Sequence, residues 1–97
     1  PSKFPAVRRD IAVVVARKAA AADLLAVIRH AAGRLLTEAR IFDVYQGEGL
    51  ENNEKSIAVG LTFQDEERTL KDGDVQAAEA AIVAALTSAF GARLRGE

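Results

Sequence analysis

The stretch FDVYQGEGL, residues 42–50, contains the pair of side chains in this sequence best suited to molecular recognition. Asp43 and Tyr45 alternate with the apolar Phe42 and Val44, and successive side chains of a strand point to opposite faces of its sheet. The alternation predicts a strand that buries Phe42 and Val44 and presents a carboxylate beside a phenol on its other face. A carboxylate accepts hydrogen bonds from N–H groups, and an aromatic ring gives a base a surface on which to stack. The GEGL that follows is predicted to be only a turn.

Two other stretches resemble a phosphate-binding loop and a metal or acid–base site only superficially. The GEG at 47–49 leads to no helix, and Glu48 and Glu51 would repel a phosphate, so a hairpin is expected there. The three acids of QDEERT, 64–69, lack convergent partners for a metal or for acid–base chemistry, so a solvated loop is expected.

The remaining reactive residue types are scarce. His30 is the only histidine, and it lies off the apolar stripe of its predicted helix, so it is expected to face solvent. The chain has no cysteine, which excludes disulfides, thiol catalysis and cysteine-based metal sites. We therefore predict no catalytic residue, no metal site and no cofactor in this domain.

The elements that would position Asp43 and Tyr45 follow from the periodicity of the apolar residues. Strands are expected at 8–17, 36–47, 55–63 and 92–95, and amphipathic helices at 21–33 and 72–90. This βαββαβ order predicts an α+β, ferredoxin-like sandwich, in which a four-stranded antiparallel sheet of strand order 4-1-3-2 carries both helices on one face. Residues 1–97 are expected to form one domain.

Alternation also predicts which side chains the two sheet faces carry. The helix-covered face should hold Ile11, Val13, Val15, Ile57, Val59, Leu61 and Phe63. The open face should hold Arg8, Asp10, Ala12, Val14, Ile41, Asp43, Tyr45, Ser56, Ala58, Gly60, Thr62, Arg93 and Arg95. A base could stack on Tyr45 above the small Ala58 and Gly60, with its edge read by Asp43 and Ser56, as in RNA-binding sheets of this topology.

The bulk composition sets the remaining expectations. The net charge of −1 gives no general attraction to nucleic acid, so any RNA affinity must come from a local patch. No signal peptide or membrane span is visible, which makes a cytoplasmic location without membrane contact the default expectation. The chain starts at Pro1 and has no methionine, so we expect it to be part of a longer protein.

KFPAVRRDIAVVV, FDVYQG and KSIAVGLTFQDEERTLKD, taken together, are similar to the C-terminal ferredoxin-fold anticodon-binding domain of bacterial phenylalanyl-tRNA synthetase beta subunits, over essentially the whole chain. The resemblance implies binding of the anticodon stem-loop of phenylalanine tRNA. It implies that Tyr45 stacks on the first anticodon base, a guanine, and that Asp43 and Ser56 read its edge. Arg8, Arg93 and Arg95 are weaker candidates for phosphate or stacking contacts.

The resemblance also implies a setting for the domain. In that family a catalytic alpha subunit uses ATP, magnesium and phenylalanine within an (αβ)₂ enzyme, so the domain would not be an enzyme by itself. Its partners would be the tRNA, the rest of the beta subunit and the alpha subunit. The chain departs from the family at Lys71, where threonine is common, so Asp72 is expected to cap the second helix, whose first turn Gly73 weakens. Arg68 and Thr69 should organise the start of that helix.

Two alternative functions stay open on the sequence. A ferredoxin-like module can instead sense a small ligand or dimerise through its open sheet without catalysing anything. An enzyme of the acylphosphatase type would need a phosphate-binding loop after the first strand, where ARKAAAAD offers only Arg17, Lys18 and backbone groups.

Overall fold

The elements follow the expected βαββαβ order. A computed structural model describes residues 3–96. Its elements are β1 (Val7–Ala16), α1 (Ala21–Ala32), a 3₁₀ turn η1 (Gly33–Leu35), β2 (Leu36–Tyr45), β3 (Glu54–Phe63), α2 (Asp72–Phe90) and β4 (Arg93–Leu94). The antiparallel sheet has the order β2-β3-β1-β4, which confirms the ferredoxin-like topology and the strand order 4-1-3-2.

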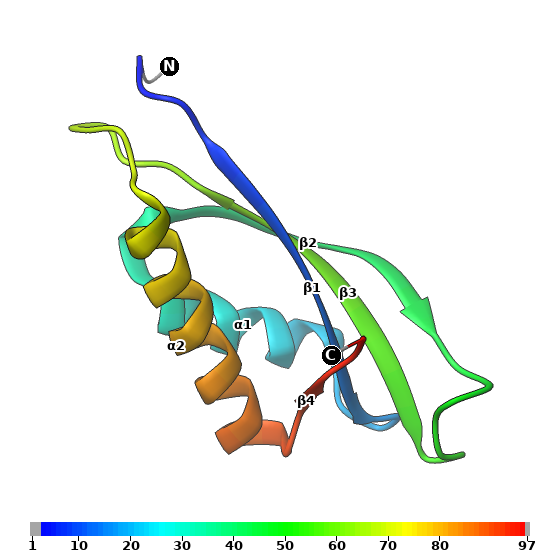
Figure 1. The fold of residues 1–97 in the computed structure, drawn as a ribbon. Helices are drawn as coiled ribbons and strands as arrows, with labels where there is room; N and C mark the ends of the chain where they lie inside the picture. The colour runs from blue at the N-terminus through cyan, green and yellow to red at the C-terminus, as the bar shows by residue number, and fades with distance from the viewer. Residues whose placement is uncertain (1–2, 97) are drawn as a thin grey trace.

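Both helices lie on one face of the sheet, and the core fills the layer between them (Figure 1). The side chains expected on the covered face of β1 and β3 are buried, and so are Leu24 and Ile28 of α1 and Ile82 and Leu86 of α2. The sequence places these apolar residues at strand and helix periods, and that spacing gives each element one face to bury. Among residues 3–96 no helix is long and apolar enough to cross a membrane.

Strand β2 departs from regular alternation, which corrects three expectations. Ile41 pairs with Val59 and packs against the core, so it does not lie on the open face. The register then skips Phe42, and Asp43 pairs with Ala58. Such a β-bulge places one extra residue in one strand. Phe42 is 46% exposed and Val44 is 50% exposed, so neither is buried as expected. Val44 shares a face with buried Ile57, but this end of the edge strand extends past the helices (Figure 1).

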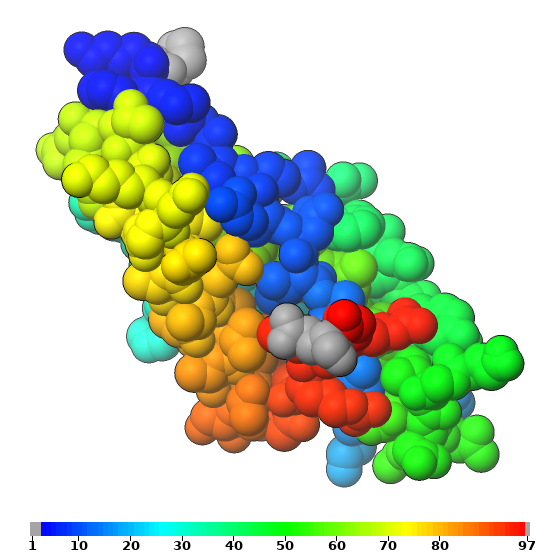
Figure 2. Space-filling view, viewed as in Figure 1, coloured from blue at the N-terminus to red at the C-terminus, as the bar shows by residue number. Residues whose placement is uncertain are grey.

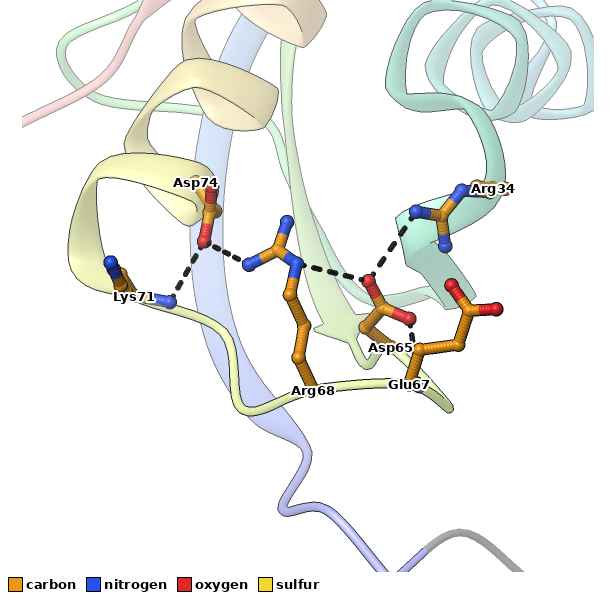
Figure 3. A network of polar contacts seen from close by, with 6 residues as sticks. All are labelled: Arg34, Asp65, Glu67, Arg68, Lys71 and Asp74. Atoms are coloured by element: carbon orange, nitrogen blue, oxygen red, sulfur yellow. Dashed lines mark hydrogen bonds and ion pairs between the residues drawn. The ribbon is translucent and has the colours of Figure 1, made fainter.

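The start of α2 is capped differently from the expectation. Lys71 occupies the N-cap position, and the side chain that reaches back is that of Asp74 and not Asp72. The Asp74 carboxylate accepts the Lys71 N–H at 2.9 Å, because a short acidic side chain in the first turn can satisfy the donor at the N-cap. Arg68 donates to the same carboxylate at 2.7 Å, which confirms its expected place at the start of the helix (Figure 3).

The loop before α2 is anchored by a buried acid, so the expected solvated loop is wrong for Asp65. The side chain of Asp65 is only 1% exposed. It accepts the Glu67 N–H at 3.0 Å and lies 3.4 Å from the Arg34 guanidinium and 3.5 Å from that of Arg68 (Figure 3). The Glu67 N–H, followed by Arg34, holds the pKa of Asp65 below its ordinary value. Asp65 thus ties the turn after α1 to the start of α2.

Candidate nucleic-acid interface

The side chains of the uncovered sheet face are set by the register of β2, β3, β1 and β4. Pairing places together Glu38, Arg40, Asp43 and Tyr45 from β2, Ser56, Ala58, Gly60 and Thr62 from β3, Arg8, Asp10, Ala12 and Val14 from β1, and Arg93 from β4. Sequence reasoning missed Glu38 and Arg40, because it counted parity through the bulge at Phe42. Such a bulge shows only in the pairing register, where β2 advances from Ile41 to Asp43 while β3 moves by one residue, from Val59 to Ala58.

Tyr45 and Asp43 lie together at the end of this face next to the hairpin. The Tyr45 hydroxyl donates to the Glu48 carbonyl at 2.9 Å, which fixes the hydroxyl end of the ring against the turn. The Asp43 carboxylate is exposed and forms no hydrogen bond or ion pair within the described part of the chain. An aromatic ring held in place beside a free carboxylate suits a flat ligand whose edge carries N–H donors.

Arg95 already occupies part of this site. Its guanidinium carbon lies 4.3 Å from the centroid of the Tyr45 ring, in a cation–π contact. Figure 2 shows the C-terminal segment, in red, reaching the green surface formed by the end of β2 and the hairpin. Arg95 therefore lies at the predicted site, although it is engaged with the protein itself.

Ser56 faces the expected side but is covered. It lies between Tyr45 and Val14 in a row of paired residues that continues to Arg93. Ser56 is 3% exposed and Val14 is 2% exposed, which is unusual for residues on a face that no helix covers. The role of Ser56 in reading a base stays a prediction, and it requires that the side chains that now bury Ser56 move.

Arg93 is held by an acid that sequence reasoning did not single out. Its guanidinium makes a bidentate bridge to Glu54, with distances of 2.7 and 3.2 Å. The hydrogen bonds from Arg93 lower the pKa of Glu54 to about 2, so this carboxylate is ionised at neutral pH. The signal was available, because Glu54 precedes Ser56 by two residues and therefore shares its face.

Arg8 lies at the opposite end of the face, away from Tyr45. It forms an exposed ion pair with Asp10 at 3.3 Å, and its guanidinium lies over Gly60. A Cβ added at Gly60 would clash with that guanidinium, so the bare glycine makes room for it. Arg8 and Tyr45 are thus not brought together, and a single base could not contact both.

The rest of the described chain offers no competing chemistry. Residues 3–96 contain no group of three or more histidine, cysteine or acidic side chains that could hold a metal ion. His30 is exposed, as expected.

Comparison with known proteins finds similar domains. A family model described as the ferredoxin-fold anticodon binding domain matches residues 2–95. Phenylalanine–tRNA ligase beta subunits of Vibrio cholerae, Methylococcus capsulatus and Pseudomonas savastanoi are 52%, 50% and 49% identical to the chain over 94 residues. Each match covers 97% of this chain and 12% of the relative, so the chain spans about an eighth of the length of these relatives.

Proposed function

Because the chain belongs to the ferredoxin-fold anticodon binding domain family, we propose that it binds the anticodon stem-loop of phenylalanine tRNA through its open sheet face. The observation that carries this proposal is the position of Tyr45 and Asp43, side by side at the exposed end of that face. The beta-subunit names of the relatives support phenylalanine tRNA as the partner.

The chemistry of the two side chains favours guanine over other bases. The Tyr45 ring supplies a stacking surface, worth roughly 1–3 kcal/mol per base. The Asp43 carboxylate has two acceptor oxygens, which match the adjacent N–H donors on the Watson–Crick edge of guanine. Adenine would place a ring-nitrogen acceptor against the carboxylate, and a lost bidentate pair costs about 1–3 kcal/mol. Ser56 would add a hydrogen bond once it is uncovered.

The basic side chains are assigned more weakly. Arg93 and Arg95 lie at the same end of the sheet as Tyr45, where they are placed to contact a nearby phosphate if their present contacts break. Arg8 lies at the far end and would contact only a more distant part of the loop.

We also propose that the chain works as part of a phenylalanine–tRNA ligase. In that setting it would sit in the beta subunit of an (αβ)₂ assembly in the cytoplasm, and the alpha subunit would use ATP, magnesium and phenylalanine. The domain would contribute tRNA recognition and no chemical step.

A titration followed by NMR tests the RNA proposal. The ¹⁵N-labelled chain is titrated with the anticodon stem-loop and with a loop whose first anticodon base is adenine. We expect shifts centred on Asp43 and Tyr45 with the guanine loop and much weaker binding of the adenine loop. Equal binding of both loops would refute base reading at this site.

Two substitutions of one residue separate stacking from the hydroxyl contact. Tyr45→Ala removes the ring and should weaken binding about 5- to 150-fold, which corresponds to the loss of one stacked base. Tyr45→Phe keeps the ring and loses only the hydrogen bond to Glu48, so it should bind nearly as the parent chain does. Unchanged binding by Tyr45→Ala would refute the stacking role.

A further inference from the structure

We propose that Arg95 is a built-in competitor for the base. In the RNA-free chain its guanidinium occupies the space over the Tyr45 ring that a stacked base needs, and Glu54 holds it there through Arg93. The identity of the ligand that displaces Arg95 rests on the proposed function. The position of Arg95 over Tyr45 and Ser56, called the cover below, can be tested without RNA.

The path of the Arg95 side chain follows from the sheet register. The Arg95 N–H donates to the Ala12 carbonyl at 2.8 Å, so its backbone runs along the outer side of β1. Tyr45 lies on β2, with β3 and β1 between the two residues, and neighbouring strands are about 4.8 Å apart. The 4.3 Å contact between guanidinium and ring therefore requires the Arg95 side chain to extend across the open face towards β2, because the Tyr45 hydroxyl is held at the turn by the Glu48 carbonyl.

This path explains why two residues of the open face are buried. Ser56 and Val14 occupy the row of paired residues between Tyr45 and Arg93, and Arg95 is hydrogen-bonded to Ala12 in the neighbouring row, so the Arg95 side chain has to pass close to both to reach Tyr45. A base that contacted both the Tyr45 ring and the Ser56 hydroxyl would have to take the space where the guanidinium now lies.

The ion pair between Arg93 and Glu54 helps to keep the Arg95 backbone in place. Strand β4 has only two residues, and it pairs with β1 only at Val13 and Val14. The bidentate bridge from Arg93 to Glu54 adds a charge-assisted tie to β3. Glu54 thus acts as a positioning residue, because it fixes Arg93 two residues before Arg95.

The cation–π contact between Arg95 and Tyr45 is weak enough for a stacked base to replace it. An exposed cation–π pair is a modest interaction, and a base stacked on an aromatic ring is at least as favourable. RNA can bind only those molecules in which Arg95 has left the Tyr45 ring. The measured Kd is therefore the Kd of this open form divided by the fraction of molecules that are open. Removing Arg95 should therefore tighten RNA binding about two- to fivefold.

Thiol labelling tests the cover in the absence of RNA. The chain has no cysteine, so Ser56→Cys introduces a single reactive thiol under the proposed cover. We expect slow alkylation by iodoacetamide in this variant and alkylation about two- to fivefold faster when Arg95→Ala is added, the same factor by which the open fraction should rise. Thr62→Cys is the control, because it lies on the same face of the same strand at the end away from β4, and its labelling should not respond to Arg95→Ala. An unchanged rate at Ser56→Cys would overturn the proposal.

Tyrosine fluorescence gives an independent measurement should Ser56→Cys fold poorly. Tyr45 is the only tyrosine and the chain has no tryptophan, so its emission reports this ring alone. Acrylamide should quench it more steeply in Arg95→Ala than in the parent chain or in Arg29→Ala. Arg29 is exposed on α1 and forms no side-chain contact within the described residues, which makes it a matched control. Equal quenching in all three chains would overturn the proposal.

Titration of the same chains with the anticodon stem-loop then separates the two proposals. If the parent chain fails to bind the stem-loop while labelling responds to Arg95→Ala, the proposed function fails and the cover stands. If the parent chain binds, tighter binding by Arg95→Ala than by Arg29→Ala supports competition. Equal or weaker binding by Arg95→Ala would overturn it and leave Arg95 as an RNA contact or a bystander.

Discussion

The two glycines at the ends of helix α2 should respond in opposite directions to the same substitution. Gly73 is in the first turn with ordinary helical geometry, whereas Gly91 ends the helix in the left-handed region, with φ of 65° and its N–H bonded to the Thr87 carbonyl at 2.8 Å. A Cβ added at either position would meet no atom within 4 Å apart from its chain neighbours and the backbone of its own helix, so neither substitution creates a tertiary clash. The difference between them is therefore one of backbone conformation alone.

The magnitudes follow from that difference. Gly73→Ala should raise the free energy of unfolding by roughly 0.5–1 kcal/mol, because alanine loses less backbone freedom on folding into a helix. Gly91→Ala should lower it by about 1–2 kcal/mol, because a Cβ in the left-handed region approaches the following carbonyl oxygen. Gly91→Asn should lower it less, because asparagine tolerates that region.

Urea unfolding and thermal melts of the three variants measure these changes. A chain of this size should shift its Tm by about 4–8 °C per kcal/mol, so the two alanine variants should melt roughly 10 °C apart. If Gly91→Ala leaves Tm unchanged or raises it, the assignment of a cost to the left-handed backbone at Gly91 is wrong, whereas a lower Tm for Gly73→Ala would contradict the argument from helix propensity.

Two further predictions concern the open face and the bulge. The pKa of Glu54 is lowered to about 2 from an ordinary 4.5, so its contribution to stability is complete above pH 4.5 and is lost as the pH falls towards 2. The urea midpoint should fall over that range, and it should fall less in Arg93→Gln, which lacks the bridge; an identical pH profile would contradict the assignment. Phe42→Ala should lower the free energy of unfolding by less than about 1 kcal/mol, because the ring is half exposed, whereas a loss above about 3 kcal/mol in urea unfolding would mean that the ring is buried.

The architecture could be predicted from the sequence because its signals are local and periodic. Alternating Ile57, Val59, Leu61 and Phe63 gives β3 its buried face, and Val75, Ala78, Ile82 and Leu86 give α2 its stripe. Elements with one apolar face and this order have few ways to pack, and the strand order 4-1-3-2 follows from that restriction.

The features that escaped prediction depend on partners that are distant in sequence. Asp65 is buried with Arg68 of its own loop and with Arg34, which lies 31 residues earlier in the sequence, and no local pattern predicts the contact with Arg34. Ser56 was placed on the correct face, but it is buried there, and the cover that we propose for it comes from Arg95 at the other end of the chain. In a regular strand, alternation predicts the direction in which a side chain points, whereas tertiary packing decides whether solvent reaches it.

The bulge in β2 changes which residues of the strand share a face of the sheet. Ile41 faces the helices and Asp43 faces the opposite side, although two residues of one strand normally share a face. Phe42 is thus the extra residue of the bulge and has no partner in the register of β2 with β3. A chain shortened by deletion of residue 42 would carry Asp43, Val44 and Tyr45 on the same faces as now, in regular alternation after Ile41. Loss of this one residue is therefore expected to be neutral for the open face, while loss of the residue between Asp43 and Tyr45 would turn one of them away from it.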